Sequence, residues 1–173
     1  MNHKIYALFS ILFAVSLLAA CAPAASHSSG HNMDDHSDML ITGDPFDAAF
    51  IDGMIEHHEG ALVMAEQALA ESTRPEILAL AEAINATQAA EIEQMQSWRA
   101  EWYPDLVSAH GLDMDMGPME VPDDPSQPFD LRFIDAMVPH HEGALHMAEA
   151  ALQLSNRPEI LALAEEIIRT QTA

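Results

Sequence analysis

The strongest constraint on the fold of this 173-residue chain is an internal repeat. Residues 46–88 align with residues 129–171 at a constant offset of 83 and without a gap, and 30 of the 43 aligned positions are identical. The phrase "FIDGMIEHHEGALVMAE" of the first copy returns as "FIDAMVPHHEGALHMAE" in the second. Because both copies keep the same residues at the same spacing, we infer that the same structural or chemical constraint acts on both.

Each copy is predicted to form two helices. Asp47 and Asp130 are candidate N-caps of the first helix, which is expected to end near Glu71 in one copy and near Leu154 in the other. A break at "STRP" follows, with its proline suited to the first position of a second helix that runs to about residue 98. Two such hairpins predict an all-α fold, a four-helix bundle with a long connection between its second and third helices.

The last helix is expected to be about ten residues shorter than its counterpart, because the second copy stops at Ala173. The sequence leaves open whether the protein ends there or whether the chain is a fragment. The predicted organisation is a signal peptide (1–21), a tether containing His and Met (22–43), a first hairpin (44–102), a Met-rich connecting loop (103–128) and a second hairpin (129–173).

The chain begins with a segment that resembles a bacterial lipoprotein signal. Lys4 is followed by an apolar run over residues 5–20 and then by Cys21, the only cysteine. A lipid on Cys21 would anchor the protein to a membrane on the extracytoplasmic side, in the periplasm or at the cell surface. The alternatives are a plain secretory signal and an uncleaved anchor helix.

The charge of the chain excludes one large class of partners. Aspartate and glutamate number 28 against 6 lysines and arginines, which gives a formal net charge of −22. Such a chain repels nucleic acid, and no basic patch opposes this reading. Aromatic residues make up only 6%, so the core is expected to rely on Leu, Ile, Ala and Met.

The candidate site lies on the first helix of each copy. At about 100° per residue, Met54, His57, His58 and Met64 fall on the apolar stripe, whereas Glu56, Glu59 and Glu66 face water. The second copy repeats the same four residues as Met137, His140, His141 and Met147, and it adds His146 where the first copy has Val63.

Thioether and imidazole groups together form a soft to borderline donor set. This set suits a copper ion, with Cu(I) favoured, and its histidines also suit Cu(II) or Zn(II), whereas it suits cations that prefer oxygen ligands poorly. The alternative for each methionine alone is core packing, and the alternative for each histidine alone is a hydrogen-bonded structural role.

The second helix and the loops contribute further candidates. Glu91 and Met95 fall on the core-facing stripe of the second helix, and Glu91 is either a ligand or a hydrogen-bond partner of His57 or His58. The second copy has no counterpart of either residue. The connecting loop adds His110, Met114, Met116 and Met119, and the tether adds His27, His31, His36, Met33 and Met39.

The motifs "FDxxFIDxMxxHHEGALxMAE", "RPEILALA" and "TQxxEIxxM" resemble the family called domain of unknown function 305, over residues 46–98 and 129–173. The family is similar in kind to ferritin-like helical proteins, and some of its members are of the CopM type of periplasmic copper-binding, copper-tolerance proteins. The resemblance implies an extracytoplasmic helical bundle and copper binding by the Met and His set. The second copy departs from the pattern because it lacks the "EIxxM" end.

The leading hypothesis is a lipid-anchored protein without catalytic activity that sequesters copper or passes it to a metal-handling partner protein. One rival is a di-iron ferritin-like redox enzyme, which needs inward glutamates and Glu-x-x-His pairs. Here the residue three before His57 is Met54, and the residue three before His140 is Met137. The other rival is a structural or partner-binding module in which His and Met serve packing.

Overall fold

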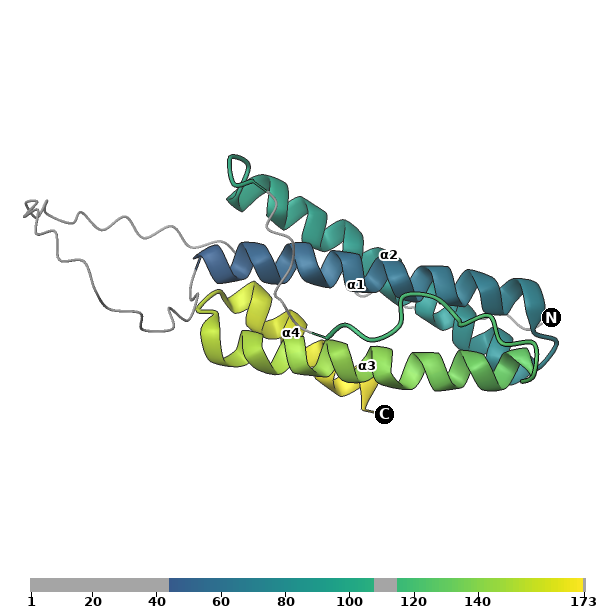
Figure 1. Cartoon of the computed structure of the whole chain (residues 1–173). Helices are drawn as coiled ribbons and strands as arrows, with labels where there is room; N and C mark the ends of the chain where they lie inside the picture. Colours follow the sequence, from purple (N-terminus) through teal and green to yellow (C-terminus); the bar gives the residue numbers. More distant parts are fainter. Residues whose placement is uncertain (1–43, 108–114, 173) are drawn as a thin grey trace, which may run out of the picture. The chain divides into compact units, whose positions relative to one another are not determined.

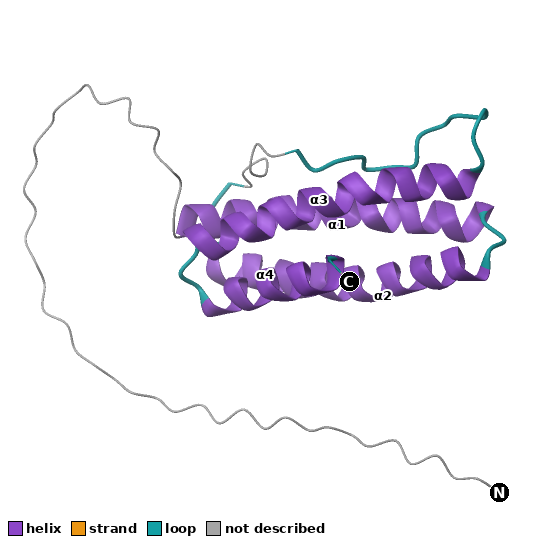
Figure 2. Cartoon of the chain, turned by 90° about the horizontal axis from the view of Figure 1, so that it is seen from below, coloured by secondary structure: helices purple, strands orange, loops and turns teal. Residues whose placement is uncertain are grey.

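The computed structural model describes residues 44–107 and 115–172, and within these ranges every regular element is an α-helix (Figure 1). The helices are α1 (Asp44–Glu71), α2 (Pro75–Trp102), α3 (Phe129–Leu154) and α4 (Pro158–Gln171). Helix α1 packs against α2 and α3 packs against α4, so each repeat forms an antiparallel hairpin. The hairpins meet through α1 and α3, which lie in one layer, while α2 and α4 lie in the other (Figure 2).

The predicted all-α four-helix bundle is therefore confirmed. The helix α2 runs four residues beyond its predicted end, to Trp102, and its last turn stacks Trp98 on Trp102 with ring centroids 5.2 Å apart. None of the described helices combines the length and the apolar character that a membrane span requires.

The two hairpin turns show how the repeated sequence produces the same local structure twice. A proline occupies the first turn of both α2 and α4, where a missing N–H costs no hydrogen bond. Just before it, the backbone N–H of Arg74 donates to Oγ of Ser72 at 3.2 Å, and that of Arg157 donates to Oγ of Ser155 at 3.1 Å. Hydroxyl-supported turns of this kind interrupt a helix, so α1 and α3 end where the repeat predicted.

The starts of α1 and α3 correct the sequence prediction. Helix α1 begins three residues before Asp47, and the N-cap of α3 is a proline two residues before Asp130, so neither aspartate is an N-cap. Each aspartate instead pairs with the turn arginine of the other repeat. Arg157 Nε lies 3.8 Å from a carboxylate oxygen of Asp47, and Arg74 Nε lies 2.9 Å from one of Asp130. The carboxylates join the hairpins rather than capping the helices.

The core consists of two clusters, and each cluster draws side chains from both repeats. All four helices contribute to the first cluster, whose largest members include Phe46, Phe50, Met95 and Ile160. The second cluster is built by α1, α2, α3 and Val121 of the connecting segment. Helix α4 has 14 residues against 28 in α2, which explains why it contributes to one cluster alone.

Candidate metal centre

The first histidines of the two repeated phrases meet where α1 packs against α3. His57 and His140 are both fully buried, with 0% of each exposed. Nε2 of His57 donates to the carbonyl oxygen of His140 at 2.8 Å, and Nε2 of His140 donates to the carbonyl oxygen of His57 at 3.0 Å. Their ring centroids are 3.7 Å apart. Equivalent residues that exchange equivalent bonds imply an approximate two-fold axis between the repeats, which passes between these imidazoles.

The reciprocal bonds fix the position of the ring protons. A carbonyl oxygen only accepts, so Nε2 carries the hydrogen in each ring and Nδ1 keeps a bare lone pair. Neither Nδ1 has a hydrogen-bond partner among the described residues. Burial lowers the pKa of His57 to about 3, with a further lowering from the neighbouring imidazole, and burial lowers the pKa of His140 to about 4. Both rings are therefore neutral at pH 7 and present a donor atom.

His58 has a third Nδ1 atom without a hydrogen-bond partner among the described residues, and its ring is held by a carboxylate. This side chain is also fully buried, and its Nε2 lies 2.7 Å from Oε2 of Glu91 in α2. Of the two roles predicted for Glu91, this contact is the hydrogen-bonding one. A carboxylate on one imidazole nitrogen orients the ring and increases the basicity of the other nitrogen toward a metal. Nδ1 of His58 has no partner within the described ranges.

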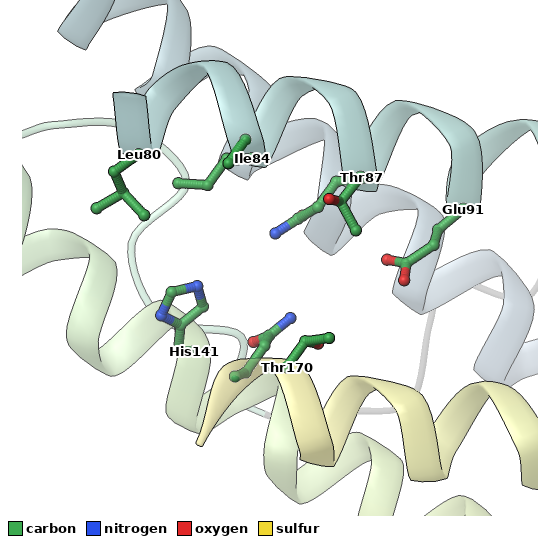
Figure 3. Close-up of a pocket in the computed structure, with 9 residues that line it drawn as sticks. Leu80, Ile84, Thr87, Glu91, His141 and Thr170 are labelled. Carbon is green, nitrogen blue, oxygen red and sulfur yellow. The ribbon is translucent and has the colours of Figure 1, made fainter. Parts of the chain in front are cut away.

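His141 occupies the position of His58 in the second repeat but not the same environment. It is half-buried and lines a cavity between α2 and α4 (Figure 3). No side chain corresponds to Glu91 in the second repeat, and His141 forms no hydrogen bond with any residue that the structure describes. Burial, with a smaller electrostatic effect of His58, lowers the pKa of His141, so its neutral form is favoured.

The five methionines predicted on the helices are all buried in the core. Met54, Met95 and Met147 belong to the first cluster, and Met64 and Met137 belong to the second. The reciprocal histidine pair therefore shares its interior with thioethers from both repeats. The packing role weighed for each methionine is realised, and thioethers from both repeats lie in the same protein interior as the buried histidines.

The connecting segment crosses the bundle beside the repeated histidines, and residues 115–121 of this segment are called the strap. A Cβ added at Gly60 would lie 2.7 Å from Cε and 2.8 Å from Sδ of Met119. A Cβ added at Gly143 would lie 2.9 Å from the backbone carbonyl carbon of Met116. The glycine of each HHEG phrase thus permits close approach of the strap. Met119 fills the space beside Gly60 on this turn of α1.

The comparison with protein families matches the family described as "Domain of unknown function (DUF305)" over residues 23–99 and 47–173. The chain belongs to the DUF305 family. Among solved structures, it is similar to CopM in the Cu(II)-bound form, with 36% identity, 73% of this chain and 88% of that chain covered, and a TM-score of 0.60. CopM in the Cu(I)-bound form shows 35% identity, coverage of 73% and 87%, and a TM-score of 0.61.

A third structure, a DUF305 fragment from Deinococcus radiodurans, shares 25% identity with the chain, covers 76% of it and 91% of its own length, and has a TM-score of 0.62. The search of curated proteins found no match.

The remaining candidate ligands of this DUF305 chain are dispersed. His146 is exposed on α3, and Met116 and Met119 are half-buried on the strap. His110 and Met114 lie outside the described residues, as do Cys21 and the tether histidines and methionines. Within residues 44–107 and 115–172, no three His, Cys, Asp or Glu side chains converge on a cation site. A site built from this part of the DUF305 chain therefore has to draw on thioethers.

Sequence reasoning overlooked the "TQ" dipeptide that ends the repeated region of both copies. Thr87 and Gln88 of α2 face Thr170 and Gln171 of α4 across the cavity that His141 lines. Oε1 of each glutamine is buried and has no hydrogen-bond partner in the described part of the DUF305 chain. The signal in the sequence was the recurrence of this dipeptide in both copies, in which the glutamines are buried or half-buried and the threonines are exposed.

Proposed function

We propose that this DUF305 protein is a copper-binding protein that works outside the cytoplasm and favours Cu(I). The observation that carries the proposal is the set of three buried Nδ1 atoms without hydrogen-bond partners, on His57, His58 and His140, in an interior that also holds five methionine side chains. Burying an imidazole without satisfying its polar atoms costs free energy, and a metal ion would satisfy them. Neutral imidazoles and thioethers are the donors that Cu(I) prefers.

The similarity to CopM supports this choice of metal. CopM has been solved with Cu(I), Cu(II) and silver, and the silver-soaked form shares 35% identity with this chain. Silver(I) is a soft ion of the same charge as Cu(I), which agrees with the thioether-rich interior described above.

The proposed ligands follow from this interior. The helical ligands are His57, His58, His140 and His141 with the neighbouring methionines, and Glu91 acts through its hydrogen bond to His58. The other members of the proposed metal-binding set are Met54, Met64, Met95, Met137, Met147, His146, His110, Met114, Met116 and Met119. The exposed and loop donors would capture metal at lower affinity than the buried set.

The proposed location rests on the leader sequence. The apolar run that ends at Cys21 supports lipidation of that residue, and the lipid would hold the protein at the membrane. There it would sequester copper or transfer it to a metal-handling protein.

A second candidate function has one observation in its favour. The reciprocal bonds between His57 and His140 satisfy both Nε2 atoms and join the repeats without any metal. In that reading the imidazoles and thioethers serve the assembly of the bundle, and the protein acts through its surface.

An anaerobic titration of the chain without its leader, residues 22–173, separates the two candidates. We expect sub-micromolar binding of Cu(I) in competition with a chromophoric chelator, and a marked loss of affinity in His58→Ala. The matched control is His146→Ala, which removes an exposed imidazole on α3 and should retain tight binding. Absence of Cu(I) binding by the wild-type chain would favour the structural candidate. Unchanged binding in His58→Ala would move the site to the strap and tether.

A further inference from the structure

The proposed copper site raises the question of how an ion reaches it, and the inference below rests on that proposed function. His57, His58 and His140 are fully buried, and the helical methionines are buried as well. An ion from solvent must therefore pass between helices. The two-fold relation of the repeats offers two opposite approaches to the histidine pair, one under the strap and one between α2 and α4.

The approach under the strap is closed by direct contacts. Met119 lies against Gly60, and the backbone of Met116 lies against Gly143, so closely that neither glycine leaves room for a methyl group. At Gly117, whose φ is 69°, an added Cβ would lie 2.8 Å from backbone atoms of His140. A tightly packed backbone offers no passage to a hydrated ion.

The approach between α2 and α4 contains a cavity of about 160 Å³ (Figure 3). At roughly 30 Å³ for each water molecule, this volume holds a small hydrated ion. Thr87 and Thr170 line the cavity from equivalent positions of the two repeats, and so do Gln88 and Gln171. The cavity therefore lies on the approximate two-fold axis, on the α2–α4 side of the bundle.

Two side chains connect this cavity to the buried histidines. His141 lines it from α3 without any hydrogen bond within the described residues, so its imidazole is available to an incoming ion. Glu91 lines it from α2, and the same carboxylate lies 2.7 Å from Nε2 of the fully buried His58. The Glu91 side chain is 14% exposed. The cavity is thus separated from the buried imidazole ring of His58 by one carboxylate.

The electrostatics of the cavity favour a cation. Glu91 brings a negative charge, and neither lysine nor arginine is among the lining residues. Gln88 is 4% exposed and its Oε1 lacks a hydrogen-bond partner in the described ranges, so its amide has unused capacity next to the cavity. Carboxylate, imidazole and amide groups can exchange for the water molecules of a hydrated ion one at a time.

We propose that the cavity between α2 and α4 is the port through which a soft metal cation reaches the buried site. His141 is its first ligand. Glu91 draws the cation inward and passes it to His58, and the thioethers beyond complete its capture. His141 and His58 therefore have different tasks although they are equivalent in the repeat, and the presence of Glu91 beside one of them explains the difference.

The test measures the rate of Cu(I) loading separately from the amount bound. Residues 22–173 without metal are mixed anaerobically with a bicinchoninate complex of Cu(I) in a stopped-flow instrument, and the loss of its absorbance is followed. Ala83→Trp fills the cavity and leaves every metal donor in place, and Ala79→Trp is the matched control because Ala79 is exposed on the same helix and does not line the cavity. His141→Gln, which removes the imidazole from the cavity lining, is measured in the same way.

We expect Ala83→Trp to slow loading by about tenfold or more with unchanged final occupancy, and Ala79→Trp to load like the wild type. His141→Gln should also slow loading by about tenfold. Equal loading rates for Ala83→Trp and Ala79→Trp, with copper still bound, would contradict the proposed port and leave the proposed copper binding in place. Faster loading in Gly60→Ala only would place the passage at the strap and would also contradict the proposed port. A wild-type chain that takes no copper would overturn the proposed function and the port together.

Should Ala83→Trp fail to give the helical circular dichroism of the wild type, Thr87→Trp replaces it. Thr87 is exposed on α2 and lines the same cavity, so the same loss of rate is expected.

Discussion

His57 and His140 each donate a hydrogen bond from Nε2 to the backbone carbonyl of the other, at 2.8 and 3.0 Å. Both carbonyls belong to helix interiors, so the contact fixes the separation and the register of α1 and α3 at the two-fold axis. A buried imidazole pair that already satisfies half of its polar atoms can remain in the core without a metal. The other half, the two Nδ1 atoms, remains open to a ligand.

The first prediction concerns stability as a function of pH. The pKa of His57 is lowered to about 3 and that of His140 to about 4, whereas both should titrate near 6.5 in the unfolded chain. The unfolded state therefore binds more protons between these values, so stability is complete above about pH 6.5 and is lost as the pH falls toward 4 and 3. At pH 5, each of the two histidines should have lowered the free energy of unfolding by about 2 kcal/mol relative to its value above pH 6.5.

Urea unfolding of the metal-free chain, followed by circular dichroism between pH 7 and pH 5, measures this loss. The double variant His57→Gln/His140→Gln should be less stable at pH 7 and should lose most of the slope. His146→Gln, which removes an exposed histidine, should keep the slope. A free energy of unfolding that stays constant from pH 7 to pH 5 in the wild type would contradict the assignment of the two rings as neutral and buried.

The second prediction compares the two HHEG glycines. Replacing either by alanine adds helix propensity worth about 1 kcal/mol, which opposes any clash. At Gly60 the nearest atoms are Cε and Sδ of Met119, the end of a flexible side chain. At Gly143 they are backbone atoms of Met116 and Asp115, all within 3.0 Å. Gly60→Ala should therefore stay within about 1 kcal/mol of the wild type, and Gly143→Ala should lose about 1–3 kcal/mol.

Equilibrium unfolding at pH 7 distinguishes the two glycine variants, and each serves as the control of the other because the repeat places them in equivalent positions. If Gly143→Ala proves as stable as Gly60→Ala, the strap backbone moves more freely than its close contact implies.

Much of the fold follows from the sequence because the repeat makes each hairpin a second observation of the same structure. The helical spacing of 100° per residue correctly predicted that His57 and His58 are buried and that Glu59 is exposed, because only the apolar stripe of the helix can face the core. The starts of the helices were predicted wrongly at Asp47 and Asp130. An aspartate near a helix start looks the same in sequence whether it caps the helix or pairs with an arginine from the other repeat.

The contacts of the site lie beyond what periodicity can predict. The bond between His57 and His140 joins residues 83 positions apart, and only the packing of α1 on α3 brings them together. Likewise, the choice between the two roles of Glu91 depends on the rotation of α2 against α1, which no local pattern determines. The cavity beside His141 is lined by both α2 and α4, and no pattern in the sequence predicts that these two helices face each other there.

The third prediction compares the two ion pairs between the repeats. The Arg74–Asp130 pair is short at 2.9 Å, but 71% of the arginine side chain is exposed. The Arg157–Asp47 pair is longer at 3.8 Å, but Asp47 is only 3% exposed. The guanidinium of Arg157 also lies 4.2 Å from the ring centroid of Trp102. Burial should decide the outcome, because an exposed pair is screened and a buried carboxylate left behind is costly.

Arg157→Ala should therefore lose on the order of 3 kcal/mol of stability, and Arg74→Ala less than about 1 kcal/mol. Urea unfolding at low and high salt provides the measurement, and the effect of Arg74→Ala should shrink further at high salt. A larger loss in Arg74→Ala than in Arg157→Ala would show that distance rather than burial sets the strength of these pairs.

The fourth prediction tests the proposed task of Glu91 on bound copper. Glu91→Gln keeps a side chain that can accept the hydrogen bond of His58 Nε2 but removes the negative charge, so the imidazole becomes a weaker donor to a metal. The affinity for Cu(I) should fall by about 10- to 100-fold while the number of bound ions stays the same. Glu93→Gln is the matched control, because Glu93 is exposed on the same helix two residues away. Competition with a chromophoric chelator measures both quantities. A reduced number of bound ions would make Glu91 a direct ligand, and an unchanged affinity would leave its contact with His58 a matter of packing alone.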